Sequence, residues 1–416
     1  MALEWLKASP LAFKVLIVSA AIENIAFGLI LPLLSIYTVE ELGIQETLGG
    51  VVLAAYTITG VPAVIIGGML ADKIGRRIVL LTSLSLMSIT LMSYMFATGF
   101  LTLIIIVLAD SFVGSLYMPA ANAMIADVIP QADRPRAYST LRVSWNTGMF
   151  IGPAIGAVLL ATYSIRELFL FGAIILACAF VLNLVFIPET RPASVESQEI
   201  TFRNVMAVGK NQAFLLIVSM TGVLWFFMTQ WVSVLPLYVT NDLKLDVGVP
   251  SLLFSINALM VVALQLWVTS HMVRFRRSLV LIVGQLIISA GFSLIFFGND
   301  LYSLIACIVL ITVGEIIYMS IISAIIADLS PEAERGVYMG FAGFIQSLGM
   351  GVGLFFGMWL LDVFPQDKYL WPIFGAIGAF TSVGYLFFAR IIGPEKDHPS
   401  KYSVPIPIKN IPIEKG

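Results

Sequence analysis

The chain has 416 residues, of which 59% are hydrophobic and 12% are charged. The charged fraction is about half that of an ordinary globular protein, so the composition excludes a set of soluble domains and predicts an all-α polytopic membrane protein. The formal net charge of −2 gives no reason to expect a nucleic-acid partner. The lipid bilayer is the partner that the composition requires.

Twelve apolar runs follow one another along the chain, and a membrane-spanning helix needs about 20 such residues. Their approximate bounds are 12–38, 48–70, 78–98, 101–129, 137–162, 166–188, 211–240, 249–272, 278–297, 301–329, 337–363 and 369–392. The longest polar stretch lies between the sixth and seventh runs. We therefore predict two pseudo-symmetric six-helix bundles, 1–188 and 211–392, with a cytoplasmic linker at 189–210 and a cytoplasmic tail at 393–416.

Basic residues are distributed unevenly between the two sets of connecting segments. If the N-terminus is cytoplasmic, the inner segments hold twenty Lys and Arg residues and the outer segments hold three, Arg166, Lys244 and Lys368. Cytoplasmic loops of membrane proteins carry an excess of Lys and Arg. The sequence therefore predicts a multi-pass protein of the cell membrane with both termini in the cytoplasm.

The two halves of the chain repeat each other at a constant spacing, which we call the repeat offset. Asp127 matches Asp328, and at the same spacing Arg76 matches Arg277. A parallel repeat of two six-helix halves is typical of secondary transporters, in which the substrate site lies near the bilayer midplane between the halves.

Two motifs connect the chain to a known family. The segment after the second run reads Gly68-Met69-Leu70-Ala71-Asp72-Lys73-Ile74-Gly75-Arg76-Arg77, and we expect a short charged turn there. The fifth run contains Gly148, Gly152, Pro153 and Gly156. The first segment resembles the loop 2–3 signature of the major facilitator superfamily, and the second resembles the antiporter motif of its drug:proton exporters. The resemblance implies the major facilitator fold with twelve transmembrane helices and transport by alternating access.

The fourth run departs from the drug exporters at one position. Those proteins usually carry an arginine four residues before a glycine of this helix, whereas this chain has Asp110 before Gly114. The proton-handling role that the family assigns to the arginine is therefore not carried over.

Three carboxyl groups lie deep inside apolar runs: Glu23 in the first, Asp110 in the fourth and Glu315 in the tenth. An ionised side chain near the bilayer centre costs at least about 2.5 kcal/mol, so such groups are usually functional. Burial makes protonation near neutral pH feasible, and the deprotonated groups attract a cation. We predict that Glu23 and Glu315 are the principal acids for proton coupling and cation binding, with Asp110 third. The alternative is an acid kept neutral by a hydrogen bond between helices.

Charged residues at the predicted cytoplasmic helix ends are candidates for gating. Asp127 is followed by Arg134, and its repeat copy Asp328 is followed by Arg335. We predict that these residues form helix-end ion pairs, which hold the inner face together and re-form as the halves rock.

The family resemblance implies a further gate, a latch in the loop after the second helix. Asp72 is expected to contact the start of the eleventh helix near Gly336, because a helix N-terminus attracts an anion. This contact would favour the outward-open state. The competing explanation is a surface aspartate neutralised by Lys73. The other gating residues that the motif implies are Gly68, Gly75, Arg76 and Arg77.

The glycines of the fifth run, Gly148, Gly152 and Gly156, recur every four residues, and Pro153 adds a site for a kink. Such stripes of small residues let helices approach closely. The resemblance places a tight contact of this stripe against the eighth helix, or against the glycine-rich eleventh helix, where it would suppress leak. Ordinary packing is the competing explanation.

Polar and aromatic side chains at mid-helix depth are candidates for lining the substrate cavity. An aromatic ring near carboxylates suits a lipophilic cation through cation–π attraction. The candidates are Asn24, Tyr117, Asn122, Asn146, Trp225, Gln230, Asn257, Gln265, Tyr318 and Gln346.

Together these features favour a proton-coupled secondary transporter that exports hydrophobic or cationic small molecules, as in multidrug efflux. The nearest alternative is a proton-coupled carrier of a specific metabolite, sugar or lysolipid. A membrane-embedded enzyme or receptor is disfavoured, because the sequence has neither a nucleophile constellation nor a phosphate-cradling Gly-Lys-Ser/Thr loop. We expect no metal and no cofactor, and a monomer whose partners are protons, a small molecule and the bilayer.

Overall fold

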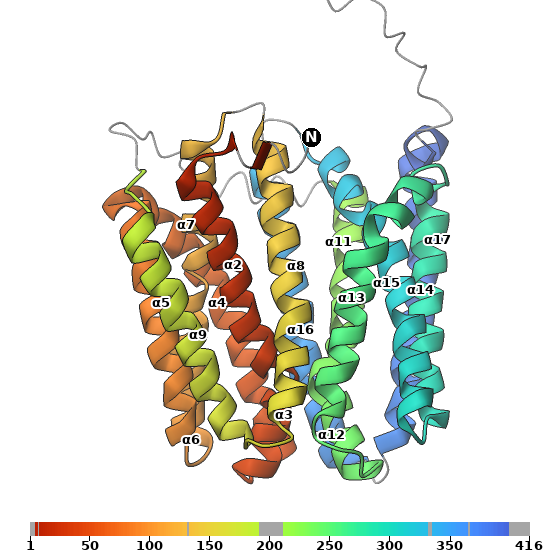
Figure 1. Cartoon of the computed structure of the whole chain (residues 1–416). Helices are drawn as coiled ribbons and strands as arrows, with labels where there is room; N and C mark the ends of the chain where they lie inside the picture. The colour runs from red at the N-terminus through yellow and green to blue at the C-terminus, as the bar shows by residue number, and fades with distance from the viewer. Residues whose placement is uncertain are drawn as a thin grey trace, which may run out of the picture.

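The computed structural model describes residues 5–6, 8–130, 133–190, 211–331, 335–364 and 367–398, and the regular elements in these residues are all helices. Most of the predicted linker and tail, 191–210 and 399–416, lies outside the described residues. The helices stand side by side in two bundles, which contain α2 to α9 and α11 to α17 (Figure 1). The chain is thus the all-α membrane protein that its composition predicts.

The N-terminal bundle contains six helical rods. The first is α2 (Leu11–Ile30), which continues through η1 (Leu31–Leu33), α3 (Leu34–Ile36) and η2 (Tyr37–Glu41). This rod changes to a tighter helix at Pro32, because proline removes one backbone donor from an α-helix. The other rods are α4 (Glu46–Ile74), α5 (Arg76–Ser93) with η3 (Tyr94–Phe96), α6 (Phe100–Gly114) with α7 (Tyr117–Val128), α8 (Arg134–Leu159) and α9 (Ile165–Phe186).

The C-terminal bundle repeats this arrangement. Its first rod consists of α11 (Gln212–Met228), α12 (Gln230–Leu237) and η5 (Tyr238–Asp242). The rods that follow are α13 (Val249–Met272), α14 (Arg277–Leu294) with η6 (Ile295–Phe297), α15 (Leu301–Leu329), α16 (Arg335–Val363) and, after η8 (Asp367–Tyr369), α17 (Leu370–Asp397).

The predicted repeat offset reappears in the bounds of these elements. The π-helical end of the first rod spans Tyr37–Glu41 in one bundle and Tyr238–Asp242 in the other. The third rod spans Arg76–Ser93 and Arg277–Leu294, which are separated by the same offset. The repeat is therefore present in the backbone as well as in the side chains.

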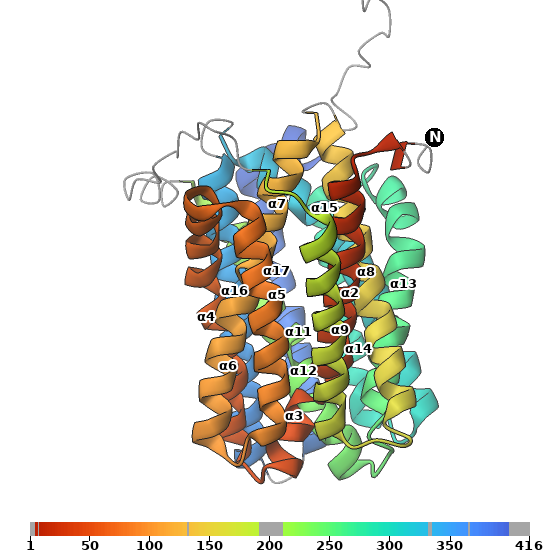
Figure 2. The ribbon, with the colours of Figure 1, turned by 60° about the vertical axis from the view of Figure 1, so that its left-hand side comes forward.

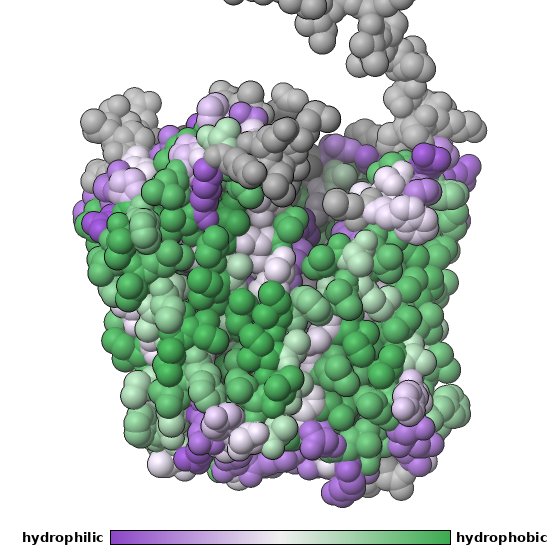
Figure 3. All heavy atoms as spheres, in the orientation of Figure 1, coloured by the Kyte–Doolittle hydropathy of each residue, from purple (hydrophilic) through white to green (hydrophobic). Residues whose placement is uncertain are grey.

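The rods are suited to a bilayer. Ten helical segments of the described residues are long and apolar enough to cross a membrane, and α13 adds a shorter apolar stretch, Val249–Gln265. The remaining rod, α8, carries Arg134 and Arg142 in its first half. Figure 3 shows hydrophobic side chains covering the middle of the surface and hydrophilic ones gathered at its two ends. This distribution matches an apolar membrane core between two aqueous faces.

The glycine stripe of α8 makes its closest contacts inside its own bundle. A Cβ atom at Gly148 would lie 2.5 Å from the carbonyl oxygen of Ala21, and one at Gly152 would lie 2.5 Å from that of Ile25, both on α2. Helix α8 also packs against α13, the eighth helix, where a Cβ atom at Gly156 would lie 3.8 Å from Oγ of Ser251. The contact between the fifth and eighth helices that the resemblance implies is therefore present, and its role in suppressing leak stays a prediction. On α16, Gly349, Gly353 and Gly357 face α11 and α12 of the same bundle or the turn between them, whereas Gly351 faces Ile58 of α4 in the other bundle. Within each bundle, these glycines let neighbouring helices approach closely.

The two bundles are fastened to each other at one end. The chain enters α2 and leaves α17 at the same end of the molecule, which we call the chain-end face; the opposite end is the far face (Figure 1). Toward the far face, Ser35 donates a hydrogen bond of 3.3 Å to the carbonyl oxygen of Val232, and Thr240 donates one of 2.6 Å to Glu40. The helices α4 and α16 also pack together across the boundary between the bundles, as the turned view in Figure 2 shows.

Candidate functional site

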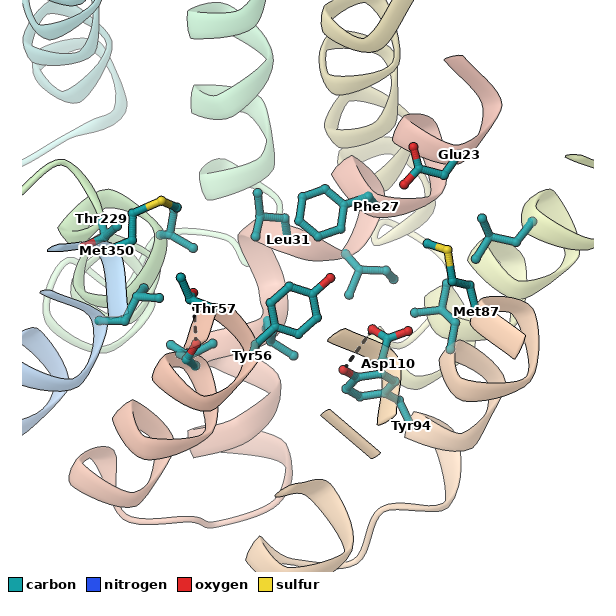
Figure 4. A pocket seen from close by; sticks show the side chains of 17 residues that line it. Glu23, Phe27, Leu31, Tyr56, Thr57, Met87, Tyr94, Asp110, Thr229 and Met350 are labelled. Atoms are coloured by element: carbon teal, nitrogen blue, oxygen red, sulfur yellow. Dashed lines mark hydrogen bonds between the residues drawn. The ribbon is translucent and has the colours of Figure 1, made fainter. Parts of the chain in front are cut away.

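A pocket lies between the bundles at mid-depth and is bordered mainly by the N-terminal bundle. Its lining comes from the first rod, α4, α5 with η3, α6 and α9, and the C-terminal bundle adds Thr229, Val232, Met350 and Leu354. Most of the lining is aliphatic or aromatic. Two carboxyl groups, those of Glu23 and Asp110, border this otherwise apolar space (Figure 4).

Asp110 is held in place by the neighbouring helix. The hydroxyl of Thr90 on α5 donates to Asp110 Oδ1 at 2.6 Å, and the hydroxyl of Tyr94 donates to Oδ2 at 3.3 Å. The Tyr94 ring is fixed in turn by stacking on Phe169, with ring centroids 4.8 Å apart. Both carboxylate oxygens therefore have a protein donor, which stabilises the ionised form in an apolar surrounding.

Glu23 has fewer partners. Its Oε2 atom accepts a hydrogen bond of 2.5 Å from the side-chain amide of Asn24. The Asn24 amide also donates to the carbonyl oxygen of Ala20 at 3.0 Å. Since Glu23 and Asp110 border one pocket, each raises the cost of ionising the other. Of the two groups, Glu23 is the less stabilised as a carboxylate.

An aromatic pair forms one wall of the pocket. Phe27 of α2 and Tyr56 of α4 are stacked, with ring centroids 6.3 Å apart and an interplanar angle of 23°. In Figure 4 these rings lie on the side of the pocket next to the two acids. Ring faces near carboxylates suit an organic cation, because the ring quadrupole attracts positive charge.

Glu315 lies apart from this pair. It is on α15 of the C-terminal bundle and is not among the residues that line the pocket. Its Oε2 atom accepts a hydrogen bond of 2.8 Å from Asn257 of α13, and the same amide donates to Thr312 at 3.0 Å. The three predicted acids are thus divided between the bundles, with Glu23 and Asp110 together and Glu315 in a separate polar cluster.

The ten predicted cavity residues do not line this pocket. Tyr117, Gln230 and Tyr318 are fully buried between helices, where Tyr318 shares a hydrogen bond of 2.8 Å with Tyr385. In this conformation, polar residues at mid-depth instead satisfy one another or the backbone inside a bundle, and their contact with a substrate stays a prediction. The others contact backbone or nearby polar groups or are partly buried outside this pocket: Asn24, Asn122, Asn146, Trp225, Asn257, Gln265 and Gln346.

Sequence reasoning missed the residues that complete the site. Phe27, Tyr56, Thr90 and Tyr94 were absent from the predicted set, although all but Thr90 line the pocket. One signal was available, because Thr90 and Tyr94 are four residues apart and therefore share a helix face. Their partner on the neighbouring helix was not deducible from spacing.

The charged segment at the chain-end face is shorter than predicted. Helix α4 continues to Ile74, so the turn between α4 and α5 consists of Gly75 alone. Gly75 has a φ of 117°, which favours glycine, and a Cβ atom there would collide with Glu189. Glu189 accepts a hydrogen bond of 2.9 Å from the backbone N–H of Arg76 at the start of α5. A Cβ atom at Gly68 would meet open space.

Arg76 connects two aspartates of the N-terminal bundle. It lies 2.9 Å from Asp72 and 3.0 Å from Asp127, and only 5% of its side chain is exposed. Asp72 thus pairs with an arginine of its own loop in this conformation. The predicted latch between Asp72 and the start of the eleventh helix remains a prediction for another conformation.

Both helix-end aspartates form ion pairs, as predicted, but the partner of Asp127 is not Arg134. Asp127 pairs with Arg76, while Arg134 donates to the carbonyl oxygen of Ala126 at 2.7 Å. Asp328 pairs with Arg277, the repeat copy of Arg76, at 2.5 Å. The side chain of Arg335 lies outside the described residues. The arginine that pairs with the aspartate comes from the start of the third rod in both bundles.

Two six-helix bundles with an apolar pocket between them at mid-depth, bordered by two carboxyl groups, define a secondary transporter. A family model described as Major Facilitator Superfamily matches residues 16–239 and 226–413. The chain therefore belongs to the major facilitator superfamily, whose members are transporters and not enzymes.

Several relatives match most of the chain. The uncharacterized MFS-type transporter YttB of Bacillus subtilis (strain 168) is 25% identical over 85% of this chain and 89% of its own length. The quinolone resistance protein NorA of Staphylococcus aureus (strain COL) is 23% identical over 85% of this chain and 90% of its own length. A Na(+), Li(+), K(+)/H(+) antiporter of Planococcus maritimus is 28% identical over 81% of this chain and 87% of its own length.

The fold is also that of solved transporters. The crystal structure of the nucleoside transporter NupG superposes with a TM-score of 0.79 over 91% of this chain and 98% of that chain, at 15% sequence identity. At this identity the likeness establishes the fold alone.

Proposed function

We propose that this protein exports hydrophobic, cationic small molecules across the cell membrane in exchange for protons. The observation that carries the proposal is the placement of Glu23 and Asp110 in one aromatic and apolar pocket between the bundles. An apolar molecule with one positive charge fits such a pocket, because the rings and aliphatic side chains cover its body while the acids neutralise its charge.

Exchange follows from competition for the same carboxyl groups. When the pocket is empty, two acids in an apolar space are costly to ionise together, so protonation of at least one is favoured. A bound cation stabilises the carboxylates and displaces the proton. Because Asp110 has donors on both oxygens and Glu23 has Asn24 alone, we assign the exchanged proton to Glu23 and the standing negative charge to Asp110.

Glu315 is the third acid of the proposal. Its distance from the pocket, in a cluster with Asn257 and Thr312, gives it a secondary role in this conformation. Glu315 would contact the bound molecule when the bundles rock and the C-terminal bundle approaches it.

The proposed orientation places the chain-end face in the cytoplasm, because most basic residues lie there. The bundles are joined toward the far face, so the conformation described would be closed to the outside. Alternating access then requires that the contacts at the far face break while contacts at the chain-end face form. The gating residues of the charged turn, Asp72, Gly75, Arg76 and Arg77, would act at that second step.

Two relatives support this class of substrate and coupling. NorA is named for quinolone resistance, and the Planococcus protein is named as an antiporter of alkali cations and protons. The latter name favours a second candidate, exchange of an alkali cation for protons. The aromatic and aliphatic lining favours an organic cation, because a bare metal ion needs several oxygen ligands.

Transport into or out of proteoliposomes with an imposed pH gradient tests the proposal. The panel should contain a lipophilic cation, its neutral isostere, a lipophilic anion, sodium and potassium. We expect pH-driven movement of the lipophilic cation and none of the anion. Movement of the alkali cations alone would establish the second candidate, and movement of the anion alone would overturn the electrostatic argument. A metabolite or sugar carrier would transport none of these probes.

A further inference from the structure

Asp362 joins the two bundles at the far face in a way that no part of the proposed transport site explains. It lies near the C-terminal end of α16, in the C-terminal bundle. Its Oδ2 atom accepts a hydrogen bond of 2.7 Å from the backbone N–H of Thr47, and a further one from the Thr47 hydroxyl. Thr47 is the second residue of α4, in the N-terminal bundle.

The contact is a helix cap supplied by another bundle. The first backbone N–H groups of an α-helix have no partner inside the helix, and an acidic side chain there is stabilised by hydrogen bonding and by the helix dipole. Gln45, which precedes α4, makes no side-chain cap of its own. The N-terminus of α4 is therefore capped across the bundle boundary by Asp362.

The helices behind this cap are closely packed. A Cβ atom at Gly50 would lie 2.8 Å from Cβ of Met358 and 2.9 Å from the carbonyl oxygen of Phe355, both on α16. Opening of the far face must separate α4 from α16 at this point. The cap must break in the same step, which leaves an unpaired carboxylate and an uncapped helix end that only water can then satisfy.

We propose that Asp362 is the latch that holds the far face closed. It stabilises the far-closed conformation and has no role in binding the transported molecule. The latch rests on alternating access, which belongs to the proposed function, but it requires neither a cationic substrate nor proton coupling. It also forms a counterpart to the latch that the family motif implies, since Asp72 lies near the other end of α4 and its expected partner is the start of α16.

Spin labels at matched positions of the two bundles measure the opening directly. Phe96 and Phe297 correspond to each other in the repeat, lie at the far-face ends of their rods, and are 68% and 69% exposed. Cys178 and Cys307 are first replaced, and single cysteines are placed at positions 96 and 297. Pulsed electron paramagnetic resonance between spin labels on these two cysteines then measures the separation of the bundles. No substrate and no pH gradient is needed, so failure of the proposed transport activity would not affect the reading.

The decisive variant is Asp362→Asn, which keeps the size of the side chain and removes its charge. We expect the ratio of far-open to far-closed protein to rise about twofold to fivefold, as for the loss of a negative charge at a helix N-terminus, because the amide oxygen can still accept the Thr47 hydrogen bonds. Thr47→Ala retains the backbone donor and should produce a smaller rise in the same direction. An unchanged distance distribution in Asp362→Asn protein that remains folded and monodisperse would overturn the proposal.

Asp300→Asn is the matched control. Asp300 caps its own helix, accepting a hydrogen bond of 2.8 Å from the backbone N–H of Ser303. These hydrogen bonds hold the pKa of Asp300 below its ordinary value, so it is charged at neutral pH. It is an acid in the same bundle, in the segment that joins two far-face helix ends, and it makes no contact with the other bundle through this cap. We expect no change in the distance distribution, and a shift as large as that of Asp362→Asn would show that surface charge, not the latch, sets the equilibrium.

Discussion

The two bundles share one backbone plan but differ in their polar groups. Arg76 of the N-terminal bundle is 5% exposed and joins two aspartates, whereas its copy Arg277 is 17% exposed and pairs with Asp328, which is itself 57% exposed. At mid-depth the N-terminal bundle contributes two acids to the pocket, and the C-terminal bundle holds Glu315 outside it. Both bundles therefore have the same helical framework, but the acids of the pocket and the more buried ion pairs lie in the N-terminal bundle.

The largest expected difference concerns the acids of the two bundles. Glu23→Gln combined with Asp110→Asn should reduce pH-driven transport by about a hundredfold, since two lost charge interactions of about 1.4 kcal/mol each multiply. Glu315→Gln should keep most of the activity, because this acid is outside the pocket. Initial rates in proteoliposomes, normalised to the amount of inserted protein, provide the comparison. Equal losses in both variants would remove the distinction between the bundles.

The next difference concerns the stability of the charged clusters. Arg76→Ala leaves Asp127 nearly buried without its arginine and should destabilise the protein by about 3 kcal/mol. Arg277→Ala removes a more exposed pair and should cost less than about 1 kcal/mol. Thermal unfolding of the purified proteins in the same detergent measures both. If the two variants unfold at the same temperature, burial of the N-terminal cluster has no energetic consequence.

A smaller effect is expected at the turn between α4 and α5. Gly75→Ala forces an unfavourable φ and displaces the Glu189 carboxylate, and should cost about 1–2 kcal/mol. The repeat copy of this position is Arg276, whose φ of −62° suits any residue, so Arg276→Ala should be neutral. Gly68→Ala should also be neutral for stability, because a Cβ atom there meets open space. Loss of transport in stable Gly68→Ala protein would indicate a close approach at this glycine in the other conformation.

The smallest expected effect is at the donors to the acids. Thr90→Val removes one hydrogen bond from Asp110 and should weaken binding of a lipophilic cation about fivefold, which corresponds to about 1 kcal/mol. Thr312→Val removes a hydroxyl that accepts from Asn257, the donor to Glu315, and should leave the affinity unchanged. Binding measured by calorimetry in detergent distinguishes the two. An unchanged affinity in Thr90→Val would mean that the hydrogen bond from Thr90 to Asp110 does not contribute to cation binding.

The sequence predicted the features that depend on the bilayer and on the repeat. Long apolar runs have few ways to fold in a membrane, because every backbone group must be satisfied inside the segment, so the helices and the repeat offset could be predicted correctly. Glu23 and Asp110 were identified for a similar reason, since a charge in the apolar core is costly wherever it points.

The contacts that individual polar side chains make with other helices could not be predicted with the same success. A polar side chain such as Gln230 or Tyr318 can face a cavity or a neighbouring helix, and both positions lie at the same depth. Likewise, Asp127 has Arg134 close in sequence, but Arg76 from the start of another helix reaches it in space. Such choices depend on helix rotation and packing, which a periodic apolar pattern in a bilayer hardly constrains.

Proton release upon substrate binding tests most directly whether a proton and a cation compete for one pocket. A lipophilic cation such as tetraphenylphosphonium is added to the detergent-solubilised protein in weakly buffered solution with a pH indicator. We predict the release of about one proton for each cation bound, in keeping with one exchanged group in a coupled acid pair. Protein with Glu23→Gln and Asp110→Asn should release none. Stoichiometric binding of the cation to the wild-type protein without any proton release would contradict the proposed exchange.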